Sequence, residues 1–129
     1  MLRRLHRRDN GQELAELALV LPVLLLVMFA ILEFGNIIFA YNAVSNVARE
    51  GARYGVAHPT DSVGIEATAR AASAGLNPSL LNINISWPGG STIRVEATYD
   101  LTLFTGFIID AIGGTSTLHI RGISTMQIE

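Results

Sequence analysis

Hydrophobic residues form one long block near the N-terminus of this chain. Residues 17–32 are all apolar, and the wider stretch 14–40 is interrupted only by Glu16, Glu33 and Asn36. At about 1.5 Å per residue, the wider stretch makes roughly 40 Å of helix, which exceeds the ~30 Å hydrocarbon core of a bilayer. The pattern therefore predicts a transmembrane helix, which we place at residues 12–40.

Two other interpretations of this block are disfavoured. A cleaved secretory signal has an apolar core of about 7–15 residues followed by small residues at its cleavage site. Here the core is longer, and residues 33–38 contain no such pattern. A buried helix of a soluble domain would need cover on every side, and the roughly 90 residues that follow are too few to provide it.

The helical pattern continues beyond the predicted span. Residues 37–54 contain no proline, and their apolar positions recur close to a 3.6-residue period. Small residues are frequent and include the candidate helix-packing residues Ala48, Gly51, Ala52 and Gly55. Because each glycine costs a helix about 1 kcal/mol relative to alanine, close approach of another element is one explanation. The other is that the two glycines fray the end of the helix, and the sequence leaves both open.

The remaining residues predict a short helix and three strands. Asp61 or Ser62 caps a helix that is expected to run to Ala74 and to stop at Gly75. Hydrophobic and polar residues then alternate with the period of half-buried strands. The expected strands are residues 81–87, 92–103 and 117–128. Three antiparallel strands with one apolar face need a cover, and the long helix is the obvious candidate.

An apolar, glycine-containing connection joins the second and third expected strands, from Phe104 to Gly114. A short helix, a loop near the membrane and a loop facing a partner remain open interpretations of it. The expected fold class is α+β. A long N-terminal transmembrane helix continues into an outer domain that contains a short helix and a three-stranded antiparallel sheet.

The distribution of arginine predicts the orientation in the membrane. Arg3, Arg4, Arg7 and Arg8 precede the span, and positively charged residues stay on the cytoplasmic side. Residues 1–11 are therefore expected to form a cytoplasmic leader, and residues 41–129 an extracytoplasmic domain. That domain holds five arginines and seven acidic residues, so it lacks the basic patch that nucleic-acid binding requires.

Candidate catalytic and metal-binding residues are scattered. The three histidines have no Asp or Glu at metal-ligand spacing, and the chain has no cysteine. Glu96 and Asp100 share the polar face of one expected strand, where solvation explains them better than acid–base chemistry. The glycine pairs at 89–90 and 113–114 lack a phosphate-binding pattern. We expect no enzymatic activity, metal, cofactor or small-molecule substrate.

Two separated motifs stand out in residues 11–55. One reads GQELAELALVLP at 11–22 and is followed by EFG at 33–35, and the other reads AREGARY at 48–54. Together they resemble the TadE-like family, whose members are pseudopilins or minor pilins of tight-adherence (Flp-type) type IV pilus systems. The resemblance implies a pilin-like fold in the bacterial inner membrane and a role in assembling a surface filament that serves cell adhesion. The implied partners are the membrane, a prepilin peptidase, other pilin subunits or copies of the chain itself, and the pilus assembly platform.

The resemblance also implies a processing site between Gly11 and Gln12. In pilin-like proteins a peptidase removes a short basic leader after a glycine at the membrane face, and a glutamate stands five residues beyond the cut, where this chain has Glu16. Gly11 is the only glycine before the span, and its missing side chain lets an extended backbone enter a tight site. Gln12 departs from the phenylalanine that is common there in major pilins, although it fits the TadE-like pattern.

Glu16 is the residue whose position most needs an explanation. A carboxylate at the centre of a bilayer costs about 2.5–3.5 kcal/mol on insertion scales. The new amine of Gln12 on a neighbouring subunit would offset this by an ion pair within the membrane. Alternatively, Glu16 lies at the level of the headgroups and needs no partner.

Three classes of function are consistent with the sequence. The first is a minor pilin or pseudopilin that takes part in assembly or initiation of a filament. The second is a structural subunit of a pilus-like filament. The third is a static membrane-anchored accessory protein of the secretion machinery. Processing at Gly11 would disfavour the third class, and abundance in sheared surface filaments would separate the first two.

Overall fold

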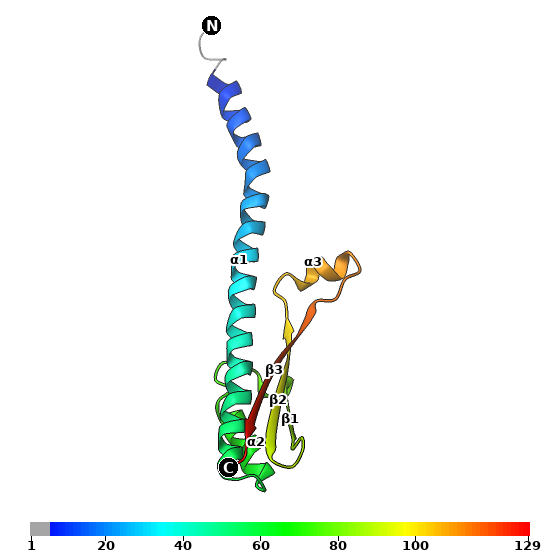
Figure 1. Cartoon of the computed structure of the whole chain (residues 1–129). Helices are drawn as coiled ribbons and strands as arrows, with labels where there is room; N and C mark the ends of the chain where they lie inside the picture. Colours follow the sequence, from blue (N-terminus) through cyan, green and yellow to red (C-terminus); the bar gives the residue numbers. More distant parts are fainter. Residues whose placement is uncertain (1–5) are drawn as a thin grey trace. The chain divides into compact units, whose positions relative to one another are not determined.

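A computed structural model describes residues 6–129, with side chains from Gly11 onward, so the side chains of the predicted basic leader lie outside the described part. The elements in chain order are α1 (His6–Ala57), α2 (Ser62–Ala71), the 3-10 turn η2 (Pro78–Leu80), β1 (Leu81–Ser86), β2 (Thr92–Thr102), α3 (Gly106–Ala111) and β3 (Thr117–Gln127) (Figure 1). The chain divides into an N-terminal unit, residues 1–34, and a C-terminal unit, residues 35–129.

The described part of the N-terminal unit is the first half of α1, which is mostly apolar from Leu14 onward. Residues 11–32 are all exposed, although most of them are large and hydrophobic. Within the described chain, α1 is the one helix that is long and apolar enough to cross a membrane. The long N-terminal helix expected from the sequence is thus confirmed, and its length and composition suggest a single-pass membrane anchor.

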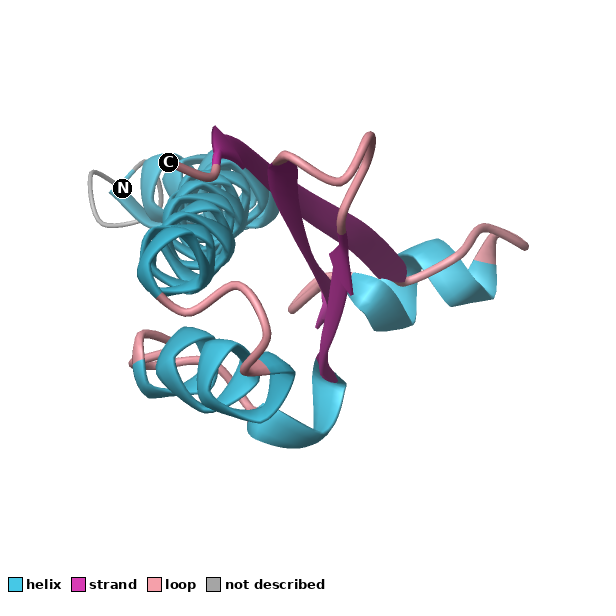
Figure 2. Ribbon diagram, turned by 60° about the horizontal axis from the view of Figure 1, so that its bottom comes forward, coloured by secondary structure: helices cyan, strands magenta, loops and turns pink. Residues whose placement is uncertain are grey.

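The C-terminal unit is a three-stranded antiparallel sheet with helices on one face. The strand order is β1-β2-β3, with Leu81 opposite Tyr99 and Leu101 opposite Leu118. α1 and α2 lie on the same side of this sheet (Figure 2). The α+β fold class is therefore confirmed, and the long helix is the cover that the apolar face required.

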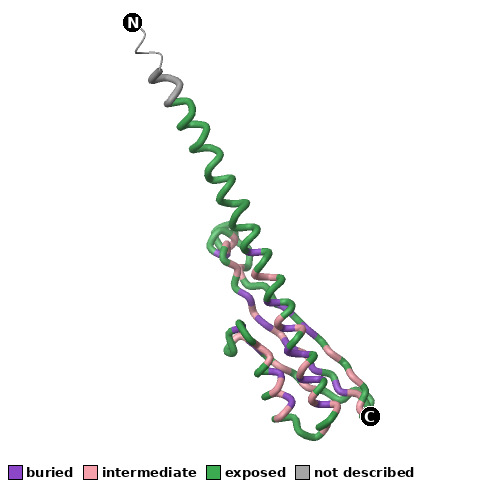
Figure 3. The backbone as a smooth tube through the Cα atoms, turned by 90° about the vertical axis from the view of Figure 1, so that its left-hand side faces the viewer, coloured by how far each residue is buried: buried purple, intermediate pink, exposed green. Residues whose placement is uncertain are grey.

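Two adjoining clusters make the core of the C-terminal unit. The first joins Ala40 and Val44 of α1 to Leu101 of β2 and Ile120 of β3. The second joins Ala52 of α1 to α2 and to the opposite end of β2. Its buried members are Ala52, Ile65, Ile93 and Val95. Most buried positions of the described chain lie in this unit (Figure 3). α1 therefore runs antiparallel to β2, and its Ala40 end lies where β2 ends and β3 begins.

The backbones of α1 and β3 approach each other closely at Gly122 of β3. A Cβ atom at this position would lie 3.0 Å from the Cα atom of Ser45 and 3.0 Å from the carbonyl oxygen of Val44. Both atoms belong to the backbone of α1, so no side-chain rotation can make room. Gly122 also lies opposite Ala97 of β2, which is fully buried. Two small residues on neighbouring strands thus allow α1 to lie directly on the sheet.

Some element ends differ from the sequence expectation. α2 ends at Ala71, three residues before the expected Ala74, because the chain turns at once and the Ser73 hydroxyl donates to the carbonyl oxygen of Arg70 at 2.6 Å. Gly75 has a φ of +82° within this turn, a conformation that favours glycine. β1 ends at Ser86, so Trp87 lies beyond the strand and is partly exposed. The third strand ends at Gln127 rather than 128.

Candidate functional site

The expected processing site, Gly11-Gln12, lies within α1. Among the described residues, no heavy atom outside the neighbouring backbone of the helix lies within 4 Å of a Cβ atom placed at Gly11. A peptidase that takes an extended backbone must first unwind the helix around the peptide bond between Gly11 and Gln12. Glycine lowers the free energy needed to unwind the helix, because a helix is about 1 kcal/mol less stable with glycine than with alanine at one position.

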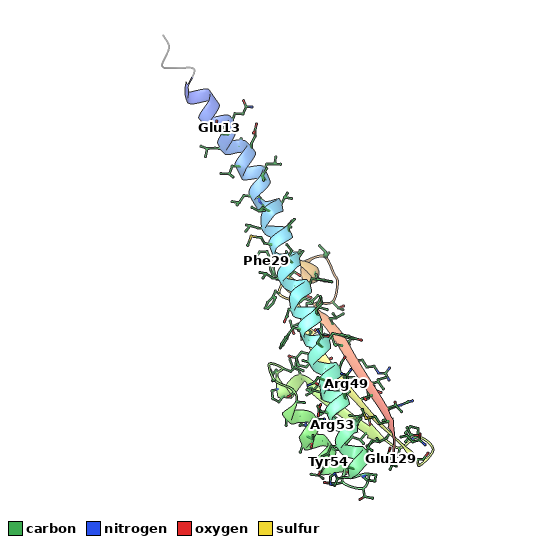
Figure 4. All side chains as sticks on the ribbon, turned by 60° about the vertical axis from the view of Figure 1, so that its left-hand side comes forward. Glu13, Phe29, Arg49, Arg53, Tyr54 and Glu129 are labelled. Carbon is green, nitrogen blue, oxygen red and sulfur yellow. The ribbon has the colours of Figure 1, made fainter. Side chains whose placement is uncertain are left out.

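Glu16 lies exposed on α1, one turn beyond Gln12. The side-chain amide of Gln12 donates to its Oε1 atom at 3.3 Å, which is a long hydrogen bond between neutral and charged groups. The sequence from 11 to 34 contains no arginine, lysine or histidine. A cation that pairs with Glu16 must therefore come from outside residues 11–34. Glu13 lies on the same helix, closer to the N-terminus (Figure 4).

The four small residues expected to pack helices, Ala48, Gly51, Ala52 and Gly55, are all buried in the C-terminal unit. A Cβ atom at Gly51 would lie 3.0 Å from the Cβ of Ala69 in α2 and 3.1 Å from Cγ1 of Val95 in β2. At Gly55 the neighbours are the side chains of Ile65 and Ile93. Both glycines lie within α1, which ends at Ala57, and the elements that approach them belong to the same chain.

Replacing Gly51 with leucine is expected to destabilise the C-terminal unit by about 1–3 kcal/mol, because the added side chain has no space between α2 and β2. Thermal unfolding of the full-length protein in detergent measures the effect. Arg49→Leu places the same side chain on the exposed face of α1 and serves as the matched control. Equal melting temperatures for the two variants would contradict the packing role of Gly51.

Tyr54, the last residue of the second motif, stabilises the turn between α1 and α2. Arg49 and Arg53 are exposed, whereas Tyr54 is half-buried and stacks on His58 with ring centroids 4.4 Å apart (Figure 4). The Tyr54 hydroxyl donates to Asp61 at 3.0 Å, and Asp61 caps α2 by accepting from the backbone N–H of Gly64 at 2.9 Å. The Gly64 N–H and then the Tyr54 hydroxyl lower the pKa of the Asp61 carboxyl group. The capping carboxylate thus stays ionised further into the acid range than a free aspartate.

The outer face of the sheet carries two cross-strand pairs that the sequence did not reveal. Arg121 of β3 donates to Glu96 of β2 at 2.7 Å, and Nδ1 of His119 lies 2.6 Å from Oδ1 of Asp100. The hydrogen bond from Arg121 lowers the pKa of Glu96. Glu96 and Asp100 therefore have partners on β3 rather than forming a pair with each other. Both pairs are solvent-exposed, where ion pairs contribute little stability.

Residues 11–53 match the family model of the TadE-like protein. The match confirms the resemblance found in the sequence. It includes the first motif with Gly11, Gln12 and Glu16, and all of the second motif except Tyr54. It suggests involvement in tight-adherence (Flp-type) pilus systems. No curated protein and no solved structure matches the chain.

Proposed function

We propose that this chain, whose residues 11–53 match the TadE-like family, is a minor pilin or pseudopilin that takes part in assembly or initiation of a Flp-type type IV pilus. The observation that carries the proposal is the position of the family match. It begins at Gly11, includes Glu16, and continues through an apolar helix that is long enough to cross a bilayer. A static accessory protein would need the anchor but would not need the glycine and the glutamate at this spacing.

The proposed topology follows from charge and length. The arginine-rich leader, residues 1–11, stays in the cytoplasm, because positively charged residues are retained on that side. Residues 12–40 span the inner membrane. Residues 41–129, which contain α2 and the sheet, lie outside, where they reach other pilin subunits and the assembly platform.

In the proposed sequence of events, a prepilin peptidase hydrolyses the peptide bond between Gly11 and Gln12. Water supplies the hydroxyl of the new Gly11 carboxylate and the proton of the new Gln12 amine. The amine becomes positively charged and is the nearest cation for a glutamate of a neighbouring subunit. Pairing it with Glu16 offsets the cost of holding a carboxylate at the start of an apolar helix.

Mass spectrometry of the protein from cells with and without the cognate prepilin peptidase tests this function. We expect a chain that starts at Gln12 when the peptidase is present and a chain that retains the leader when it is absent. Gly11→Leu should retain the leader in both, because the side chain obstructs a site that accepts glycine. A chain that is found in the filament complex with residues 1–11 still attached would contradict the proposal.

A further inference from the structure

The connection between β2 and β3 presents an apolar surface that nothing in the described chain covers fully. Its members are Phe104, Phe107, Ile108 and Ile112, which we call the apolar cap. The most exposed are Phe107, at 72%, and Ile112, at 80%. Between Asp100 and His119 the only charged residue is Asp110. Large apolar side chains gathered in this way mark a surface that contacts a partner or a membrane.

The apolar cap stands on a defined framework rather than on a loose loop. The N–H of Leu103 donates to the carbonyl oxygen of Ser116 at 2.9 Å, which extends the pairing of β2 with β3 beyond the sheet. The N–H of Gly114 donates to the carbonyl oxygen of Ile109 at 2.9 Å and ends α3. Gly113 has a φ of +83°, as a tight helix end requires. The exposed side chains are therefore held outward by the fold.

The apolar cap lies at the end of the C-terminal unit where α1 enters it. Ile37, Ile38 and Tyr41 of α1 line a groove with Leu118 and Ile120 of β3. Beyond the end of β2, the chain leaves the sheet and forms α3. The turn between β1 and β2 lies at the opposite end of the sheet (Figure 1). In a chain anchored by the residues that precede Gly35, α3 lies at the end of the C-terminal unit that adjoins the anchor along the chain.

We propose that the apolar cap inserts into the outer leaflet of the bilayer that α1 crosses. The proposal rests on the membrane anchoring in the proposed function. Aromatic and aliphatic side chains at the end that adjoins the anchor enter the boundary between headgroups and acyl chains, typically to a depth of about 5–10 Å. The exposed carboxylate of Asp110 then lies among the headgroups. A second point of insertion would fix the rotation of the outer unit about the axis of α1, and with it the face that the sheet presents to other subunits.

Lipid quenching of tryptophan fluorescence tests this insertion in the full-length protein. The chain has one tryptophan, Trp87, which lies at the opposite end of the sheet from α3. In a Trp87→Phe background, Phe107→Trp reports on the apolar cap and Phe29→Trp reports on the anchor. Each protein is reconstituted in vesicles of phosphatidylethanolamine and phosphatidylglycerol, with and without lipids brominated in the acyl chains. Ile112→Trp provides a second reporter if Phe107→Trp lowers the melting temperature.

We expect bromine to quench the tryptophans at 29 and 107, and at 112 if it is used, while Trp87 of the unmodified chain keeps its emission. Quenching at 29 without quenching at 107 and 112 would overturn the insertion and leave the membrane anchor intact. Absence of quenching at 29 would overturn both. If emission at 107 is unquenched but shifts to the blue as the protein concentration rises, a second copy covers the apolar cap, and the proposal is again overturned.

Discussion

Replacing Gly122 with valine is expected to lower the melting temperature of the protein by more than about 10 °C. Overpacking typically costs about 1–3 kcal/mol, and here the upper end applies, because the new Cβ meets the backbone of α1 at Val44 and Ser45. A domain of this size loses roughly 4–8 °C for each kcal/mol. The strand must either move away from the helix or leave the register that places Gly122 opposite Ala97.

The matched control for Gly122→Val is Thr125→Val, which places the same residue on the exposed face of the same strand. Because valine favours strands and Thr125 is not in the core, this change should leave the melting temperature nearly unchanged. Circular dichroism of the full-length proteins in detergent measures both variants. If Gly122→Val and Thr125→Val have the same melting temperature, the contact between α1 and β3 does not limit stability.

Replacing Glu16 with alanine is expected to leave membrane insertion intact and to reduce incorporation into filaments or initiation complexes strongly. Removing the carboxylate removes a penalty for placing α1 in lipid, so the membrane level should equal or exceed that of the wild type. Incorporation should fall by at least about tenfold, which corresponds to about 1.4 kcal/mol of lost pairing. Glu16→Gln keeps the size of the side chain and should reduce incorporation to the same extent, because the expected ion pair requires the negative charge.

Glu13→Ala is the control for this experiment, since Glu13 is also exposed on α1 but lies outside the expected pairing position. Membrane level and incorporation are measured in one strain for all three variants, by fractionation and by blotting of sheared filaments. If Glu16→Ala is incorporated as well as Glu13→Ala, Glu16 is a residue at the headgroup level and has no role in pairing.

The helices and strands of the C-terminal unit could be predicted where the order of apolar and polar residues matches the burial of each position. Alternation in residues 92–102 is reproduced almost position by position in the burial of β2. The predicted end of α2 was wrong because the Ser73 side chain donates a hydrogen bond to the carbonyl oxygen of Arg70. The spacing of apolar residues gives no information about such an interaction. The α3 helix was one of several open interpretations, since six residues are too few to establish a helical period.

The contact at Gly122 could have been found from the sequence. An isolated glycine within a strand pattern indicates a bulge or the close approach of another backbone, and RGI at 121–123 has this form. The sequence could not show which backbone approaches Gly122, because Ser45 and Gly122 are far apart along the chain. The neighbours of Gly51 and Gly55 could not be predicted either. Close approach was one of two explanations, and only the tertiary structure identifies α2 and β2 as the neighbours.

The docking of β3 onto α1 also determines when the protein can fold. Among the described elements, β3 is synthesised after all the others, and its Gly122 contacts a segment of α1 that was synthesised much earlier. Contacts so distant along the chain form slowly, because a long loop must close before they contribute. Until translation has passed β3, the Val44 and Ala40 side of the helix and one edge of β2 lack part of their cover. Folding of the C-terminal unit is thus coupled to the synthesis of β3, and products that terminate before Thr117 are left exposed to aggregation and proteolysis.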